Sequence, residues 1–216
     1  RSTLFPYTTL FRSRTGLSLE YFHKALANAK YRMPANAAAS DSFYILGNIA
    51  NVYTRRNLFD SAFYFFQKAF DIFKPQMHET DLLRNMENYI NANSAESVIK
   101  LVVDKAYLYL QQYYYQKDLR SLQQALSAYK TADRLLDKIK EELTEVQSRL
   151  FWQKDVRRLY EHAVEVSYLQ NNFNDAFYFF EKSRAVLLNE QLKQQSKIAD
   201  AGSRSEERRV GKECRS

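Results

Sequence analysis

The histidines of this chain are the residues that most often bind metals or transfer protons, so their spacing is the first test for chemistry. His23, His78 and His162 lie far apart in the sequence. Neither an HExxH motif nor closely spaced His/Cys ligands occur, so the spacing does not predict a zinc site. We interpret the three histidines as helix-surface or hydrogen-bonded residues, and we expect no metal and no cofactor.

Motifs for nucleophilic catalysis and for phosphate binding are also missing from the sequence. The chain has one cysteine, Cys214, which lies near the C-terminal end. There is no GxSxG elbow and no histidine beside a plausible nucleophilic serine. Phosphate-binding loops need glycines, and the whole chain has four. The sequence therefore predicts a protein that is not an enzyme.

Aromatic residues are dense, with FYFF at 63–66 and again at 177–180. Aromatics interleaved with arginine are typical of base stacking on single-stranded nucleic acid. Helical spacing instead places phenylalanines of each copy on one face, which predicts core packing for Phe63, Phe66, Phe70, Phe177 and Phe180. The other aromatics of the two runs are expected to face a neighbouring helix or a concave groove: Tyr64, Phe65 and Tyr178.

The first and last thirteen residues look like one oligonucleotide translated in opposite senses. Arg1–Ser13 paired with Arg204–Ser216 in reverse order gives thirteen pairs whose codons can be complementary, for example Pro6 (CCC) with Gly211 (GGG). The two ends resemble the translation of a common sequencing-library adapter. We therefore predict artefactual tails at 1–13 and 204–216 and one helical repeat domain over 14–203.

Excluding the tails changes the charge of the chain. They hold seven of the 32 Lys/Arg and three of the 25 Asp/Glu residues, which leaves 14–203 with a net charge of +3 instead of +7. Basic pairs such as Arg55–Arg56 and Arg157–Arg158 have acidic residues around them. We expect solvated helix faces, no nucleic-acid partner and no membrane contact. The cytoplasm is the favoured location, although the adapter residues replace the native N-terminus and any signal peptide.

Apolar residues recur at steps of three and four, and residues 14–203 contain only three glycines and two prolines. This pattern predicts an all-α fold, since an all-β domain needs more turns. The helices are expected near 16–31, 41–55, 58–74, 80–91, 97–116, 119–141, 146–170 and 173–198. Tight turns are expected at Asn57, Asp118 and Asn171–Asn172, where capping or left-handed residues are favoured. The mixed-charge run at 135–150 fits either a long repeat helix or a short coiled coil with a partner.

An internal repeat supports an array of helix pairs. NLFDSAFYFFQKA (57–69) matches NNFNDAFYFFEKS (171–183) at eight of thirteen positions. The stretch from Leu46 to Ala69 resembles the tetratricopeptide repeat, with Leu46, Ala50 and Tyr53 spaced as in its first helix and Ala62 and Phe66 as in its second. This resemblance implies a right-handed superhelix of antiparallel helix pairs, a tetratricopeptide-like solenoid. Residues 14–31 look like the second half of a repeat, so we expect a fragment.

A narrower resemblance lies at the C-terminal end of the array. FFEKSRAVLLNEQL, Phe179–Leu192, is similar to the last repeat that precedes the caspase-like domain of bacterial CHAT proteins. The preceding run QSRLFWQKDVRRLYEHAVEVSYL fits the same comparison. The resemblance implies a regulatory repeat arm whose protease domain lies after Ser203 and is missing. The alternative is the repeat sensor arm of a bacterial transcriptional regulator or sensor kinase.

Repeat arrays of this kind bind a protein or peptide segment in their concave groove, through the first helix of each pair. The sequence therefore predicts a non-catalytic protein-binding scaffold. An open-ended fragment of an array also exposes apolar faces, so homo-association is a second expectation. The predicted partner-binding residues come from two first helices: Asn48, Asn51, Arg55, Arg157, Glu161 and Glu165.

Overall fold

The computed structural model describes residues 15–29, 35–72, 78–84, 95–139, 152–185 and 188. These residues form helices and turns without a strand among them, which confirms the predicted all-α class. The adapter-like tails lie outside the described residues. In chain order the elements are α2 (Thr15–Ala29), α3 (Ala35–Arg55), α4 (Phe59–Phe70), the 3₁₀ helix η1 (Glu79–Leu83), α6 (Ala95–Gln116), α7 (Leu119–Ile139), the π-helical turn η2 (Trp152–Val156), α9 (Arg157–Leu169) and a last helix over 173–185.

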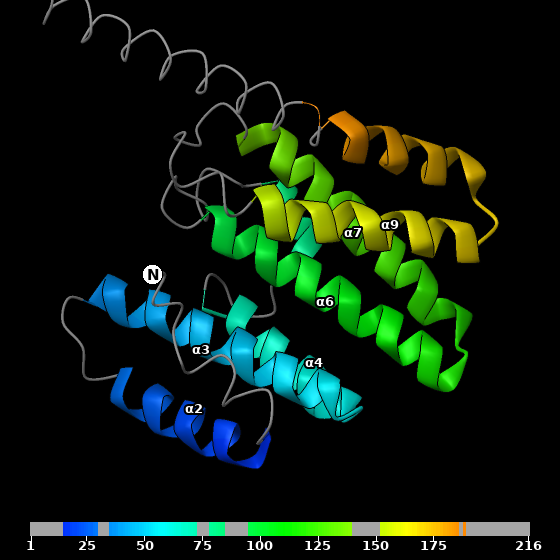
Figure 1. Ribbon diagram of the computed structural model, residues 1–216. Helices are drawn as coiled ribbons and strands as arrows, with labels where there is room; N and C mark the ends of the chain where they lie inside the picture. The colour runs from blue at the N-terminus through cyan, green and yellow to red at the C-terminus, as the bar shows by residue number, and fades with distance from the viewer. Residues whose placement is uncertain are drawn as a thin grey trace, which may run out of the picture.

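The helices form three stacked hairpins, α3 with α4, α6 with α7, and α9 with the helix over 173–185. We call α3, α6 and α9 the first helices, and their hairpin partners the second helices. The first helices contact one another in sequence, and each new first helix also packs on the preceding second helix, α6 on α4 and α9 on α7. Figure 1 shows α2 and the last helix at opposite ends of this stack. The handedness of a superhelix stays a prediction.

The three hairpin turns share one backbone feature. Asn57, Lys117 and Asn171 have φ values of 57°, 59° and 55°, in the left-handed region that ends many helices. Beyond Asn57, the Leu58 amide donates to the Tyr53 carbonyl, and the Asn172 amide donates in the same way to Ser167. These turns were predicted, but in the middle hairpin Lys117 takes the left-handed conformation.

In that hairpin Asp118 caps the next helix instead. The Asp118 carboxylate accepts a hydrogen bond from the Arg120 amide at 3.1 Å and another from the Ser121 hydroxyl at 3.1 Å. Asp118 therefore satisfies the first amides of α7, which is the ordinary role of an acidic residue at a helix N-terminus. The left-handed position falls one residue earlier, on a lysine.

Replacing Lys117 by glycine is expected to stabilise the protein by about 0.5–1 kcal/mol. The left-handed conformation is sterically unfavourable for a residue with a Cβ and is not for glycine. The change would be measured as a higher denaturant midpoint at constant m-value. Asn57→Gly is the matched control at the equivalent turn, and asparagine tolerates this conformation, so its effect should be smaller. A Lys117→Gly variant less stable than the parent would contradict this account of the turn.

Small residues lie where the helices of the first hairpin pack on each other and where α3 packs on α6. Ala50 and Ala62 are fully buried, as the repeat pattern predicts for paired helices. A Cβ added to Gly47 would lie 2.8 Å from Leu101 Cδ1, so a larger residue here would require the Leu101 side chain to shift where α3 crosses α6. Phe66 is also fully buried, as predicted for a core residue. The core runs from Phe43 through all three hairpins to Phe179.

Several predicted boundaries were wrong. Helix α3 begins at Ala35 rather than 41, because the alanine-rich ANAAAS segment favours helix. The α-helix expected over 80–91 is a 3₁₀ helix that ends at Leu83, with 85–91 outside the described residues. Helix α4 ends at Phe70, whereas the prediction extended to 74. None of the helices within the described residues is long and apolar enough to span a membrane.

Two predicted core residues were also wrong. Phe177 is 66% exposed and Phe180 is 49% exposed, whereas their counterparts Phe63 and Phe66 are half-buried and buried. The difference arises from the neighbouring helices, since α6 covers α4 and no described element covers the same side of the last helix. Helical spacing grouped these two phenylalanines on one side of the helix but assigned that side to the core, whereas the buried aromatic residue of this helix is Phe179.

Candidate functional site

The candidate site is the surface on which α3, α6 and α9 lie side by side. Hydrogen bonds between neighbouring first helices identify which side of each helix faces this surface. The Tyr44 hydroxyl of α3 forms a hydrogen bond with the Ser97 hydroxyl of α6. The Tyr114 hydroxyl of α6 donates a hydrogen bond to the Glu165 carboxylate of α9. We define the first-helix face by side chains at these contacts and by those one to three helical turns away: Tyr44, Asn48, Asn51, Arg55, Asp104, Tyr107, Tyr114, Arg158, Glu161 and Glu165.

The centre of the first-helix face is Asp104, a carboxylate that is only 3% exposed. Its oxygens accept hydrogen bonds from Asn51 Nδ2 at 2.7 Å and from Lys100 Nζ at 3.1 Å, and Arg158 forms an ion pair with it. One buried carboxylate thus connects all three first helices. A buried charge needs such partners, because an unpaired one is strongly disfavoured away from water.

The environment of Asp104 keeps it ionised. Burial alone raises the pKa of this carboxyl, but the charges of Lys100 and Arg158 and the hydrogen bond from Asn51 outweigh burial. The pKa of Asp104 therefore lies below its ordinary value. The group is a fixed anion at neutral pH, and its position between three partners indicates a structural role rather than proton transfer.

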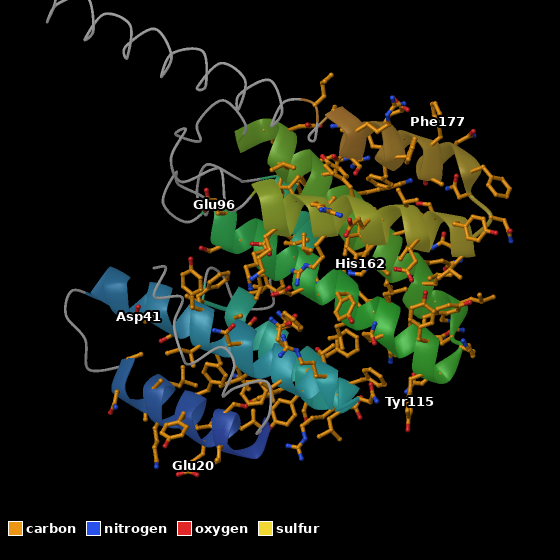
Figure 2. All side chains as sticks on the ribbon, in the orientation of Figure 1. Glu20, Asp41, Glu96, Tyr115, His162 and Phe177 are labelled. Carbon is orange, nitrogen blue, oxygen red and sulfur yellow. The ribbon has the colours of Figure 1, made fainter. Side chains whose placement is uncertain are left out.

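Aromatic rings occupy the part of the face between α6 and α9. Figure 2 labels His162 in this region, where its ring lies 5.0 Å from the ring of Tyr107, centroid to centroid. His162 Nδ1 lies 3.1 Å from Glu165 Oε2. Burial and the hydrogen bond to Glu165 raise the pKa of Tyr114 to about 12, so its hydroxyl stays protonated and donates at neutral pH.

The six residues predicted to bind a partner divide into two groups. Asn51 and Glu165 face the surface, but both make hydrogen bonds between first helices. The other four are half-buried or exposed: Asn48, Arg55, Arg157 and Glu161. Arg157 and Glu161 form an ion pair of 2.7 Å within α9. The structure thus places the predicted residues of α3 and α9 on either side of α6.

The contribution of α6 to this surface was not predicted from the sequence. Asp104 stands in the run LVVDKA, and an acidic residue inside an apolar helical run was the available signal for a buried partner. Tyr107 and Tyr114 gave a weaker signal, since α6 contains five tyrosines and their faces could be assigned only with α3 and α9 in place. Arg158 was interpreted as a solvated residue, which was wrong because it pairs with Asp104.

A second buried carboxylate, Asp133, joins the last hairpin to α7. It accepts hydrogen bonds from the hydroxyls of Tyr160 at 2.9 Å and Tyr178 at 2.7 Å, and Lys182 Nζ lies 3.4 Å away. Burial and the Asp133 carboxylate raise the pKa of Tyr160. Both phenols therefore remain donors to one acceptor, an arrangement that fixes the hairpin in place.

The described residues contain no group of three or more His, Cys, Asp or Glu side chains arranged to hold a metal ion. Asp104 and Asp133 are each engaged by hydrogen-bond donors and cations from two or more helices. Comparison with models of known protein families, with curated proteins and with solved structures found no match for this chain.

Proposed function

We propose that residues 14–203 form a non-catalytic, tetratricopeptide-type scaffold whose first-helix face binds a protein or peptide segment. The observation that supports this proposal is the row of polar and aromatic side chains that α3, α6 and α9 present together. Tyr44 and Tyr114 are partly exposed there, and Arg55 and Glu161 add charges of both signs. Aromatic and charged groups on such a row suit the recognition of an extended peptide.

The rigidity of the face supports the same proposal. Polar contacts to the buried Asp104 carboxylate connect the three first helices, from Asn51 on α3 and from Arg158 on α9. A surface held in one arrangement before binding loses less conformational entropy when a ligand docks. The exposed side chains of α3 and α9 are therefore held at a fixed separation in the absence of the partner.

This function can be tested with peptides that bind the full chain. Such peptides would be selected from a random displayed library. The Arg55→Glu and Glu161→Lys variants reverse exposed charges on the face, and each is expected to weaken a selected peptide at least about tenfold, or about 1.4 kcal/mol. Arg134→Glu is the matched control, because Arg134 is exposed on the second helix α7. Equal affinity for the parent and both face variants would refute the proposed site.

We further propose that the array is the regulatory arm of a CHAT-type protein, on the resemblance of Phe179–Leu192 to the repeat before the caspase-like domain. A long read of the source DNA across Ser203 tests this association. A reading frame that continues into a caspase-like domain with a histidine and a cysteine is the expected result. If the reading frame continues into a membrane span with a DNA-binding or kinase module, the CHAT proposal is refuted. The array would then be the sensor arm of a transcriptional regulator or sensor kinase.

A further inference from the structure

The last helix presents an exposed apolar stripe, on which the Tyr168 ring contacts only Phe173 and the Arg184 side chain only Phe180 among the described contacts. Phe173, Phe177 and Phe180 recur at helical spacing on one side, and they are 63%, 66% and 49% exposed. Figure 2 shows Phe177 on the outer side of this helix. We call these three residues the terminal stripe. Three exposed phenylalanines in one row are unusual on a protein surface that has no partner.

The opposite side of the same helix is fully engaged, so the helix is firmly placed. Phe179 is completely buried, with its ring 6.3 Å from that of Tyr160. Lys182 forms an ion pair with Asp137 at 2.6 Å, and Lys130 pairs with Asp175 at 2.5 Å. The exposure of the terminal stripe therefore does not result from a loosely attached helix.

The internal repeat shows what covers this stripe in an earlier copy. Phe59, Phe63 and Phe66 of α4 occupy the same positions as the terminal stripe in the matching segment. There α6 lies over them, since α4 and α6 are in contact. Two tyrosines of α6 make the ring contacts: Tyr109 lies 4.9 Å from Phe63, and Tyr115 lies 5.6 Å from Phe59.

The second hairpin follows the same rule, because α9 covers α7. Among the described helices, each second helix except the last is thus covered by one further helix. We propose that the terminal stripe is a docking site for an amphipathic helix of a partner protein, one with aromatic side chains six residues apart, as Tyr109 and Tyr115 are in α6. This site lies on the end of the stack and is separate from the first-helix face.

A synthetic peptide with the sequence of α6, residues 95–116, is the probe for this site. Its binding to the full chain would be followed by fluorescence anisotropy. We expect saturable binding that Phe177→Ser weakens at least tenfold, and a control peptide with serine in place of Tyr109 and Tyr115 should bind at least tenfold more weakly. Because Phe177 is exposed, its variant should keep the parent's circular dichroism and melting temperature.

The controls separate this site from the first-helix face. Arg55→Glu should leave binding of the α6 peptide unchanged, so failure at one site does not imply failure at the other. No binding of the peptide, or equal binding by the parent and Phe177→Ser, would overturn the proposal. Sedimentation velocity gives a further test: a dimer that Phe177→Ser dissociates would show that a second copy, rather than a partner helix, occupies the stripe.

Discussion

Phe66→Ala is expected to lower the free energy of unfolding by about 3–5 kcal/mol, the usual cost of deleting a fully buried phenylalanine. Phe66 has no exposed surface and packs where α4 meets its neighbours. Phe180→Ala makes the same chemical change at the matching position of the last helix. Since Phe180 is half exposed, its replacement should cost less than about 1 kcal/mol.

The contrast between these two variants tests the stacking of the hairpins. Urea denaturation followed by circular dichroism would provide both values under one set of conditions. If the helices were not stacked as described, the two phenylalanines would be in similar surroundings and would give similar costs. A Phe180→Ala variant as unstable as Phe66→Ala would show that another element covers the last helix.

Asp104→Asn is the second substitution with a large expected effect. It removes the charge that pairs with Lys100 and Arg158 and leaves those cations beside a neutral amide. Breaking a buried ion pair costs about 3–5 kcal/mol, and because both cations are about one-third exposed we expect about 2–3 kcal/mol here. Glu161→Gln breaks the exposed pair with Arg157 and should cost less than about 1 kcal/mol.

The same carboxylate predicts a pH dependence. Because the folded-state pKa of Asp104 is lowered, its contribution is fully present above the unfolded-state pKa of about 4 and is lost as pH falls through the folded-state value. This contribution would be measured by denaturant unfolding of the parent and of Asp104→Asn at several pH values between pH 7 and pH 3. The stability difference should shrink in acid, and a constant difference would contradict the assigned ionisation of Asp104.

Local sequence features predicted the helices and the hairpin turns. The repeat at 57–69 and 171–183 located two equivalent second helices, and asparagine at 57 and 171 marked their turns. These features depend on residues close together in the chain, so periodicity and turn propensity are sufficient. Lys117 was missed because lysine has no preference for the left-handed conformation, and the adjacent Asp118 was the more conspicuous turn residue.

Contacts between hairpins were not predictable to the same extent. Asp104 and Arg158 are 54 residues apart, and their pairing depends on how α9 is stacked on α6. The exposure of Phe177 also depends on neighbouring helices. Its local sequence matches the sequence around Phe63, yet Phe63 is half-buried. Periodicity identifies the apolar side of a helix, while the next hairpin determines whether that side is covered.

The measurement that most directly tests the proposed scaffold is an NMR titration of the full chain with a peptide from the library selection. Amide shift changes show which helices meet the ligand without any substitution. The proposed function predicts that the largest changes fall in α3, α6 and α9, near Asn48, Arg55 and Glu161. Changes confined to α4, α7 or the helix over 173–185 would contradict binding at the first-helix face.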